Sequence, residues 1–485
     1  MAPNETTALA AALLVIDELR AVIAVLQAQN AVLSARVAEL ERQLGLNSAN
    51  SGKPPSSDGL KKPPRTRSLR SRARNLSGGQ PGHPGRTLRQ TPAPDRVIDH
   101  APTSCRACRC PLGPPDGAAY TARQVFDLAP PPPLVVSEHR AHRCVCAGCG
   151  AVTQADFPDT VNAPVQYGPR ISAFVVYLLH AQFVPEDRLA KLMTDLFAVS
   201  MSRATIGQMS ARAGQRLACF AEAVRDRVAA APVKHLDETG FRVGGRTQWL
   251  HVAVTAGLTF YRVSRKRGSL PAPMGGIAVH DHWKPYYKMP GVVHALCNAH
   301  HLRELQALVE IEGEPWAWRM QRLLRRACYA QGLAAPLGGC GDGTLRPRFV
   351  ALINRRYDAL IAQGLALHEA QSALPPKLKL DGTPKLCRPP RRIGHNLLLR
   401  LSARKDDVLR FLTNPEVPFT NNQAERDARM MKLRQKISGG FRSDAGAEHF
   451  ATIRSLIGTA QKKTWAIIQS LMQNPSALLQ QLATT

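Results

Sequence analysis

Three acidic side chains that lie far apart in the chain constrain its fold more than any other feature. Asp237 lies in HLDETGF, Asp281 in AVHDHWKPYY and Glu425 in TNNQAERDAR. The first two acids lie at the ends of expected strands, and the third lies on an expected helix. Hard oxygen ligands of this kind suit a centre that holds a pair of Mg²⁺ ions for phosphoryl transfer. The fold must therefore bring distant segments into one site, and the chemistry predicted for that site is the cutting and joining of DNA.

Net charge and cysteine usage narrow the setting in which such a centre works. The 485 residues carry a formal net charge of +28, which is typical of proteins that bind nucleic acid or a membrane surface. No apolar run approaches the roughly 18 residues of a membrane-spanning helix, and the N-terminus lacks the features of a signal peptide. We therefore expect a cytoplasmic, nucleoid-associated protein without a membrane partner. The eleven cysteines are then expected to bind metal rather than to form disulfides.

Residues 1–45 are expected to form one long helix with a heptad repeat. Leucine recurs every seventh residue, and three positions before each leucine stands Ile16, Ile23, Asn30 or Val37. This pattern favours a parallel two-stranded coiled coil in which the asparagine holds the register. The alternative is an amphipathic helix that packs on its own protein. We expect a homodimer or higher oligomer whose contact residues are Leu19, Leu26, Asn30, Leu33 and Leu40.

Residues 46–95 are rich in serine, glycine, proline and asparagine, a composition that cannot form a core. Within them, the run KKPPRTRSLRSRAR contains only basic charges. The run is either a solvated linker or a segment that binds phosphates. In the second case the contacts come from Lys61, Lys62, Arg65, Arg67, Arg70, Arg72 and Arg74.

Residues 96–160 contain two CxxC pairs, a spacing that indicates a structural zinc site. Four thiolates from two such pairs can hold Zn²⁺ tetrahedrally, and the stretch between them is expected to form the strands of a DNA-binding zinc ribbon. Cys110 and Cys144 lie nearby and leave the ligand assignment open by one or two residues. Removal of the metal is expected to unfold so small a segment. The expected ligands are Cys105, Cys108, Cys146 and Cys149.

Residues 165–230 are expected to be helical. A buried helix in PRISAFVVYLLHAQFV is followed by a pattern that breaks at 199–202, where Ser202 can cap a helix that starts at Arg203. Two helices, a short turn and a basic second helix resemble a DNA-binding helix-turn-helix. The same pattern is common in helical proteins that never contact DNA.

Residues 231–303 are expected to contain strands. Gly244-Gly245 separates two strands of a hairpin, a third antiparallel strand follows, and a short buried strand ends at Asp281. A further strand and a helix come next. This order resembles the ribonuclease H fold, in which the first acid lies on strand one, the second at the end of strand four and the third on a helix. Glu238 is an alternative to Asp237 as the first metal ligand.

Together these motifs resemble the insertion sequence 66 family of bacterial DDE transposases. The resemblance covers nearly the whole chain, through LGLNSANSGKPPSSD, GGQPGHPGRTL, the CxxC pairs, HLDETGF, HDHWKPYY, CNAHHLREL, TNNQAERDAR and SGGFRSDAGAEHF. It implies that Asp237, Asp281 and Glu425 are the catalytic acids, as the residue patterns also indicate. It further implies a mostly helical insertion at 304–415, completion of the core by 416–485, and companion proteins of the same element.

Two further groups of residues flank the expected site. Cys297 and His300 form a CxxH motif, which either packs the core or takes part in DNA or metal binding. The helix that carries Glu425 is basic, and residues three or four apart on a helix share a face. That face is either solvated or lines the DNA path through Arg426, Arg429, Lys432 and Arg434.

The predicted architecture is multidomain α+β, with an N-terminal coiled coil, a zinc ribbon, a helical DNA-binding segment and a ribonuclease H-like α/β core with a helical insertion. The expected activity is that of a transposase, which binds terminal inverted repeats and target DNA, cuts 3′ ends and transfers strands. The expected cofactors are two Mg²⁺ per active site, which Mn²⁺ can replace, and structural Zn²⁺. The alternatives are a nuclease of the same fold without joining activity and a non-catalytic DNA-binding regulator.

Overall fold

The computed structural model describes residues 3–51, 90–113, 121–127, 134–269, 274–334, 344–374 and 390–484, with side chains from residue 13 onward. The chain divides into two compact units, and each is described by itself. The larger unit comprises Met1–Leu69, Pro164–Lys191 and Met201–Thr485. The smaller unit comprises Arg70–Ala163 and Leu192–Ser200.

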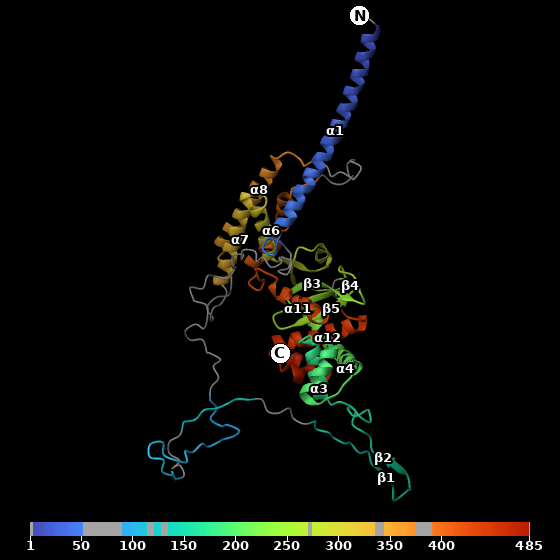
Figure 1. The fold of residues 1–485 in the computed structure, drawn as a ribbon, viewed down its shortest axis with the longest axis vertical. Helices are drawn as coiled ribbons and strands as arrows, with labels where there is room; N and C mark the ends of the chain where they lie inside the picture. Colours follow the sequence, from blue (N-terminus) through green and yellow to red (C-terminus); the bar gives the residue numbers. More distant parts are fainter. Residues whose placement is uncertain are drawn as a thin grey trace. The chain divides into compact units, whose positions relative to one another are not determined.

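A five-stranded mixed sheet lies at the centre of the larger unit (Figure 1). Its strands are β3 (Val233–Val243), β4 (Arg246–Val254), β5 (Thr259–Ser264), β6 (Ile277–His280) and β7 (Val293–Leu296). The spatial order is β5-β4-β3-β6-β7, with antiparallel pairing from β3 to β5 and parallel pairing from β3 to β7. Gly244 and Gly245 both have positive φ, as a two-residue hairpin turn requires. The predicted hairpin, third antiparallel strand and short buried strand are confirmed.

The edge strand β5 is covered by helix α12 (Asp444–Lys462). Free backbone groups at a sheet edge can pair with other chains, so edges are usually protected. Thr259 N donates a hydrogen bond to Thr459 Oγ1 at 3.1 Å, and Tyr261 N donates one to Ser455 Oγ at 2.9 Å. Gly458 permits this close approach, because a Cβ there would lie 2.9 Å from the Cβ of Thr259. One helix therefore both packs on the sheet and satisfies two donors of its edge.

Helix α11 (Asn422–Ser438) lies over β3 and β4 (Figure 1). Ala424, Ala428 and Met431 recur at helical spacing on its buried face. They share a core with Phe241 and Leu250 of the sheet. Small side chains on the helix keep it close to the strands, which brings its first turn near the strand that carries Asp237.

Besides the N-terminal helix Pro3–Gly45, four described helices precede the sheet in sequence. They are α2 (Pro169–His180), α3 (Glu186–Phe197), α4 (Arg203–Arg216) and α5 (Ala218–Ala230). The predicted cap is confirmed, since α4 begins at Arg203 and Ser202 Oγ accepts a hydrogen bond from Thr205 N at 3.1 Å. α4 packs closely on α12, because a Cβ at Gly214 would lie 2.6 Å from His449.

A helical segment lies between β7 and α11, as the sequence predicts. Its elements are α6 (Asn298–Glu310), α7 (Pro315–Ala334), α8 (Pro347–Glu369), α9 (Ile393–Ala403), α10 (Lys405–Leu409) and η3 (Arg410–Leu412). α7 and α8 run side by side (Figure 1) and share a core that contains Trp316, Met320 and Tyr357. The remaining elements of this unit outside α1 are η2 (Lys284–Lys288), α13 (Ile467–Met472) and α14 (Pro475–Thr484).

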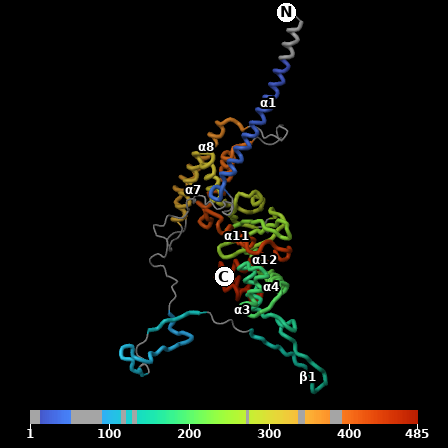
Figure 2. The backbone as a smooth tube through the Cα atoms, viewed as in Figure 1, coloured from blue at the N-terminus to red at the C-terminus, as the bar shows by residue number. Residues whose placement is uncertain are grey.

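Residues Pro3–Gly45 form the single unbroken helix α1 (Figure 2). Leu19, Leu26, Leu33 and Leu40 are 55%, 56%, 65% and 42% exposed in the single chain. The described part of the chain therefore leaves the heptad leucines uncovered, which does not fit the alternative of packing on its own protein. Self-association through this stripe stays a prediction.

The end of α1 is held against α6. The side-chain amide of Asn50, which is 2% exposed, donates to Gly45 O at 3.0 Å and to Glu310 Oε2 at 2.9 Å. Its carbonyl oxygen accepts from Asn47 N at 2.8 Å. Gly45 also lies close to Ile311, the residue that follows α6, because a Cβ added at Gly45 would lie 3.3 Å from Ile311 Cδ1. The LNSANS motif thus ends one helix and attaches it to another.

One stretch of α1, Leu13–Gly45, is long and apolar enough to cross a membrane by length and composition alone, with an 18-residue window of mean hydropathy 1.3. This corrects the expectation that no apolar run approaches that length. Alanine, valine and leucine keep the average high, although Asn30 and several charged residues interrupt the stretch. A coiled-coil helix with an apolar seam has the same composition.

The smaller unit contains one antiparallel hairpin, β1 (Arg143–Val145) and β2 (Val152–Gln154). Among the described residues between the two CxxC pairs, β1 is the only strand, so the prediction of several strands there is wrong. Val125, Val135 and Val136 are 91%, 92% and 89% exposed, and no neighbouring strand covers them. β-branched residues form stable strands only when a partner strand and a packed face are present.

Candidate active site

Two of the three predicted acids lie at the same level of the sheet. His235 of β3 pairs with Val279 of the parallel strand β6. Asp237 follows the first of these residues by two positions, and Asp281 follows the second by two. Since adjacent strands are about 4.8 Å apart, the register sets the backbones of the two acids side by side. Asp281 Oδ1 also accepts a hydrogen bond from Trp283 N at 3.0 Å, which orients its carboxylate in the turn after β6.

The third acid approaches the same strand through the residue that precedes α11. Asn421 is 2% exposed; its Nδ2 donates to Leu236 O at 2.7 Å, and its Oδ1 lies 2.9 Å from His235 Nδ1. Glu425 follows one turn later on α11. A single buried amide therefore attaches the first turn of α11 to the strand that carries Asp237.

The three predicted acids interact electrostatically. Burial, together with the negative charges of Glu238, Glu425 and Asp281, raises the pKa of Asp237 to about 8. A carboxylate that is both enclosed and surrounded by like charge is poorly accommodated without a cation. Hard oxygen donors of this kind fit a divalent ion such as Mg²⁺.

Glu425 also contacts the CxxH motif. Cys297 Sγ lies 3.7 Å from Glu425 Oε1, and His300 Nδ1 lies 3.8 Å from the same oxygen. Asn421 N donates to Cys297 Sγ at 3.1 Å. Burial and the charge of Glu425 raise the pKa of Cys297 to about 12, so this side chain is a neutral thiol near neutral pH. On the other side of the carboxylate, Arg429 pairs with Glu425 Oε2 at 3.2 Å.

Glu238, the alternative first ligand, is paired with other residues. Its side chain is 1% exposed and forms an ion pair with Arg267 at 2.7 Å. Tyr286 donates a hydrogen bond to its second oxygen. The Arg267 guanidinium lies 4.9 Å from the Trp249 ring and 4.5 Å from the Trp283 ring. These contacts occupy both oxygens of Glu238, which favours Asp237 as the metal ligand.

The basic side chains of α11 fall into two groups. Arg426 and Arg429 are exposed. Lys432 donates to a β3 carbonyl at 2.6 Å, and the Arg434 guanidinium lies 3.5 Å from the centroid of the Phe441 ring. Burial lowers the pKa of Arg434 to about 10. Arg434 therefore packs within its own unit, and the two exposed arginines are better placed to meet a phosphate backbone.

Of the other predicted DNA contacts, the linker residues 61–74 lie outside the described residues. In the predicted helix-turn-helix, Arg203 and Arg212 are exposed. Arg216 instead donates to carbonyls at the end of α13. Because α4 packs on α12, only its outer face is available to DNA.

The two CxxC pairs adopt the same turn. Cys105 N donates to Cys110 O and Arg109 N donates to Cys105 O, both at 2.9 Å. The second pair repeats both hydrogen bonds at equivalent positions, at 2.8 Å each, starting from Cys146. The residue after each pair, Arg109 or Gly150, has a positive φ. Such repetition is typical of paired metal-binding knuckles rather than of unrelated loops.

The turns also favour the thiolate form of their first cysteine. Backbone amides of each turn lower the pKa of Cys105 and of Cys146, which favours the thiolate form that binds zinc. Cys144 lies in β1, opposite Thr153, and is not part of the repeated turn. This distinction supports the predicted ligand set.

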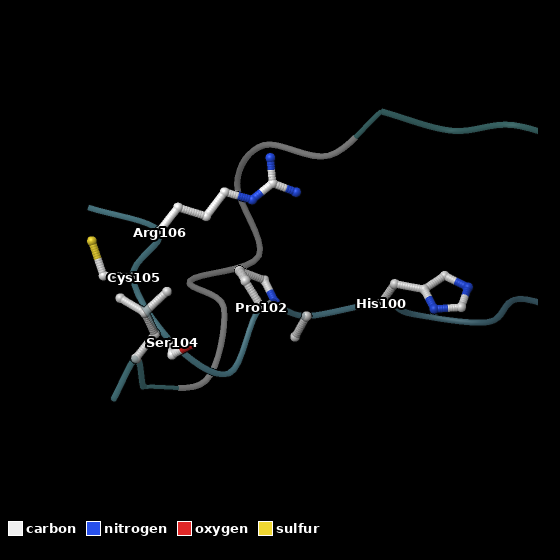
Figure 3. A pocket seen from close by; sticks show the side chains of 7 residues that line it. His100, Pro102, Ser104, Cys105 and Arg106 are labelled. Atoms are coloured by element: carbon white, nitrogen blue, oxygen red, sulfur yellow. The ribbon is translucent and has the colours of Figure 1, made fainter. Parts of the chain in front are cut away.

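The four knuckle sulfurs are not gathered, however. The described residues bring a different group together: ligand atoms of Cys297, His300 and Glu425 all lie within 4.8 Å of one another. A hollow of about 560 Å³ lies beside the first knuckle, and the Cys105 sulfur points away from His100 across it (Figure 3). Neither this hollow nor a second one between α5 and the β4–β5 turn is lined by the predicted acids.

The sheet, α11 and the three acids all fall within a segment that matches a known family. Residues 164–449, more than half of the chain, match a family model described as "Transposase IS66 family". The chain belongs to this transposase family.

Two further matches cover shorter parts of this IS66-family transposase. Residues 3–89 match a model described as "Family of unknown function (DUF6444)". Over 66 residues the chain is 41% identical to the "Uncharacterized protein y4jO" of Sinorhizobium fredii. That match spans 14% of this chain and 21% of the relative.

Sequence reasoning missed two residues of the candidate site. Asn421 stands in TNNQAER four residues before the acid, and its position before a helix gave a signal only for capping. Its side chain instead binds β3. Arg267 follows the third strand in a basic run, where it reads as a solvated charge. Only the fold brings it between two tryptophans and against Glu238.

Proposed function

We propose that this chain is a DDE transposase whose Asp237, Asp281 and Glu425 form one catalytic centre on a ribonuclease H-like sheet. The observation that carries the proposal is the parallel register of β3 and β6, in which each aspartate follows a paired residue by two positions. The first acid lies on the first strand of the sheet, the second follows the fourth, and the third lies on a later helix. That distribution agrees with the ribonuclease H arrangement expected from the sequence.

In this proposal Asp237, Asp281 and Glu425 would together hold two Mg²⁺ ions, which Mn²⁺ could replace. When bound, the ions neutralise the phosphate and activate the attacking oxygen. The donor set fits such ions, because Asp237 is enclosed among like charges that only a cation offsets. Asn421 positions the helix of Glu425, while Arg267 and Tyr286 hold Glu238 away from the metals.

The proposed reaction has two steps on the same site. Water first attacks a phosphodiester at each end of the element and leaves a free 3′ hydroxyl. That hydroxyl then attacks a phosphodiester of the target DNA, so one bond forms as another breaks, without a covalent link to the protein. The exposed Arg426 and Arg429 beside Glu425 suit contacts with the DNA backbone, since each can neutralise a phosphate.

Recognition of the terminal inverted repeats is assigned to the cysteine-rich unit, the basic linker and the outer face of α4. The two identical knuckle turns support a Zn²⁺ ion held by Cys105, Cys108, Cys146 and Cys149, which requires the two turns to approach each other. The zinc content of two variants tests which cysteines are ligands. Cys146→Ser is expected to lose the ion, and Cys144→Ser is expected to keep it. Equal zinc in both variants would exclude this ligand set.

The exposed heptad of α1 is proposed to pair two subunits, one for each end of the element. Companion proteins of the same element and a location on the nucleoid belong to the same proposal. The companion proteins follow from the family resemblance and the location from the net charge, not from a described contact.

A joining assay with pre-cut element-end oligonucleotides and Mg²⁺ tests the central claim. Glu425→Gln and Asp427→Asn each remove one negative charge from α11, but Asp427 pairs with Lys462 at 2.8 Å, away from the acid site. Only Glu425→Gln is expected to abolish joining. Cleavage of uncut element ends without joining of the pre-cut ends by the wild type would favour the nuclease, and full biological activity of Glu425→Gln would favour the non-catalytic regulator.

A further inference from the structure

Beside the proposed magnesium centre lies a second set of donors with different chemistry. Cys297 Sγ, a ring nitrogen of His300 and a carboxylate oxygen of Glu425 all lie within 4.8 Å of one another. They come from two elements, because Cys297 and His300 are at the start of α6 and Glu425 is on α11. Thiol, imidazole and carboxylate are the ligand types that zinc prefers, whereas magnesium avoids sulfur.

The distances from Glu425 to the other two ligand atoms match those around a tetrahedral ion. Ligands that lie about 2.0–2.3 Å from a tetrahedral Zn²⁺ are separated from one another by roughly 3.3–3.8 Å. The sulfur lies 3.7 Å and the imidazole Nδ1 lies 3.8 Å from the same oxygen of Glu425. Three ligands can therefore meet one ion with small side-chain adjustments, and a fourth position stays open for water or a DNA oxygen.

The surroundings of two of the donors favour a metal. The sulfur accepts a backbone hydrogen bond from Asn421 N at 3.1 Å and lies at the N-terminus of α6, whose positive potential offsets part of the charge that a metal-bound thiolate carries. His300 Nδ1 is buried and makes no hydrogen bond with any described residue. Cys297 is 1% exposed but the His300 side chain is 30% exposed, so an ion can enter past the imidazole.

We propose that Cys297, His300 and Glu425 bind one Zn²⁺-class ion, and that this ion withdraws Glu425 from the magnesium centre and inhibits the enzyme. Binding releases the thiol proton to solvent as the sulfur–metal bond forms. The inhibition rests on the proposed function, since it requires Glu425 to be a catalytic ligand, but the binding does not. The simpler interpretation is that Cys297 only packs α6 against α11.

Zinc binding is measured first, on the full chain, by equilibrium dialysis against Zn²⁺ and metal analysis. Cys297→Ser is expected to bind one ion fewer per chain than the wild type. Cys328→Ser is the matched control, because Cys328 is a partly buried thiol of α7 outside the site and its loss is expected to leave the count unchanged. His300→Gln, at a partly exposed position, is expected to lose the same ion and covers the case in which Cys297→Ser misfolds. Equal counts in the wild type and His300→Gln would overturn the proposal.

Inhibition is measured next, by adding Zn²⁺ to the Mg²⁺-dependent joining reaction and comparing each protein with its own zinc-free rate. His300→Gln is expected to raise the half-inhibitory zinc concentration at least about 10-fold, since even the loss of a supporting residue around a metal costs 10–100-fold in affinity. Unchanged inhibition would show that zinc acts elsewhere and would overturn the inhibitory role. If the wild type joins no DNA at all, the proposed function fails while the dialysis result still decides the binding site.

Discussion

Asn421 offers the sharpest test of how the fold assembles its acids. Asn421→Ala removes the hydrogen bond to Leu236 O at 2.7 Å and the one to His235 Nδ1 at 2.9 Å. Both partners are buried, and each buried polar group left unsatisfied costs about 1–3 kcal/mol. We therefore expect the free energy of unfolding to fall by about 2–5 kcal/mol. The rate of joining is expected to fall about 10–100-fold as well, because the first turn of α11 is no longer attached to β3.

Urea unfolding followed by tryptophan fluorescence measures the stability change, since all five tryptophans lie between residues 249 and 465. Asn422→Ala is the matched control: Asn422 is the next residue in the chain and is exposed. Its substitution is expected to change stability by no more than about 0.5 kcal/mol. If the two variants unfold at the same urea concentration and join DNA at the same rate, the reasoning about Asn421 is refuted.

Three other substitutions test separate parts of the structure. Burial lowers the pKa of His180 to about 3, so on acidification the unfolded chain binds a proton before the folded chain does, and the free energy of unfolding falls as pH drops from about 6.5 towards 3. His180→Gln should flatten this fall, as measured by thermal melting at a series of pH values. An unchanged dependence of stability on pH would contradict the prediction. Leu26→Glu should dissociate the predicted dimer, as measured by analytical ultracentrifugation. Val25→Glu should not, because Val25 is equally exposed in the single chain but lies off the heptad seam. Identical behaviour of the two variants would exclude this seam as the dimer contact. Arg267→Gln should lower the free energy of unfolding in urea by about 2 kcal/mol, because it leaves the buried carboxylate of Glu238 with one partner. Arg265→Gln, which breaks a surface ion pair, should change it by no more than about 0.5 kcal/mol. Equal losses in the two variants would argue against a contribution from the buried pair.

Local features of the chain were predictable because neighbouring residues decide them. Ser202 caps α4, since a side-chain oxygen reaches an amide three residues on. Gly244 and Gly245 form the hairpin turn, since only glycine adopts positive φ twice in succession without strain. The same reasoning failed between the CxxC pairs, where β-branched residues alone predicted strands that lack a partner to pair with.

The sequence by itself determined which residues could form a site: three acids in short motifs, a heptad of leucines and two identical knuckles. Only the tertiary structure decided how those residues are related. It paired the oxygens of Glu238 with Arg267 and Tyr286, packed Arg434 on Phe441, and set Cys297 against Glu425. Backbone geometry and side-chain periodicity act over a few residues and can be read along the chain. Contacts such as that between Asn421 and β3 join residues far apart in sequence, and their partners are known only once the sheet and its helices have packed.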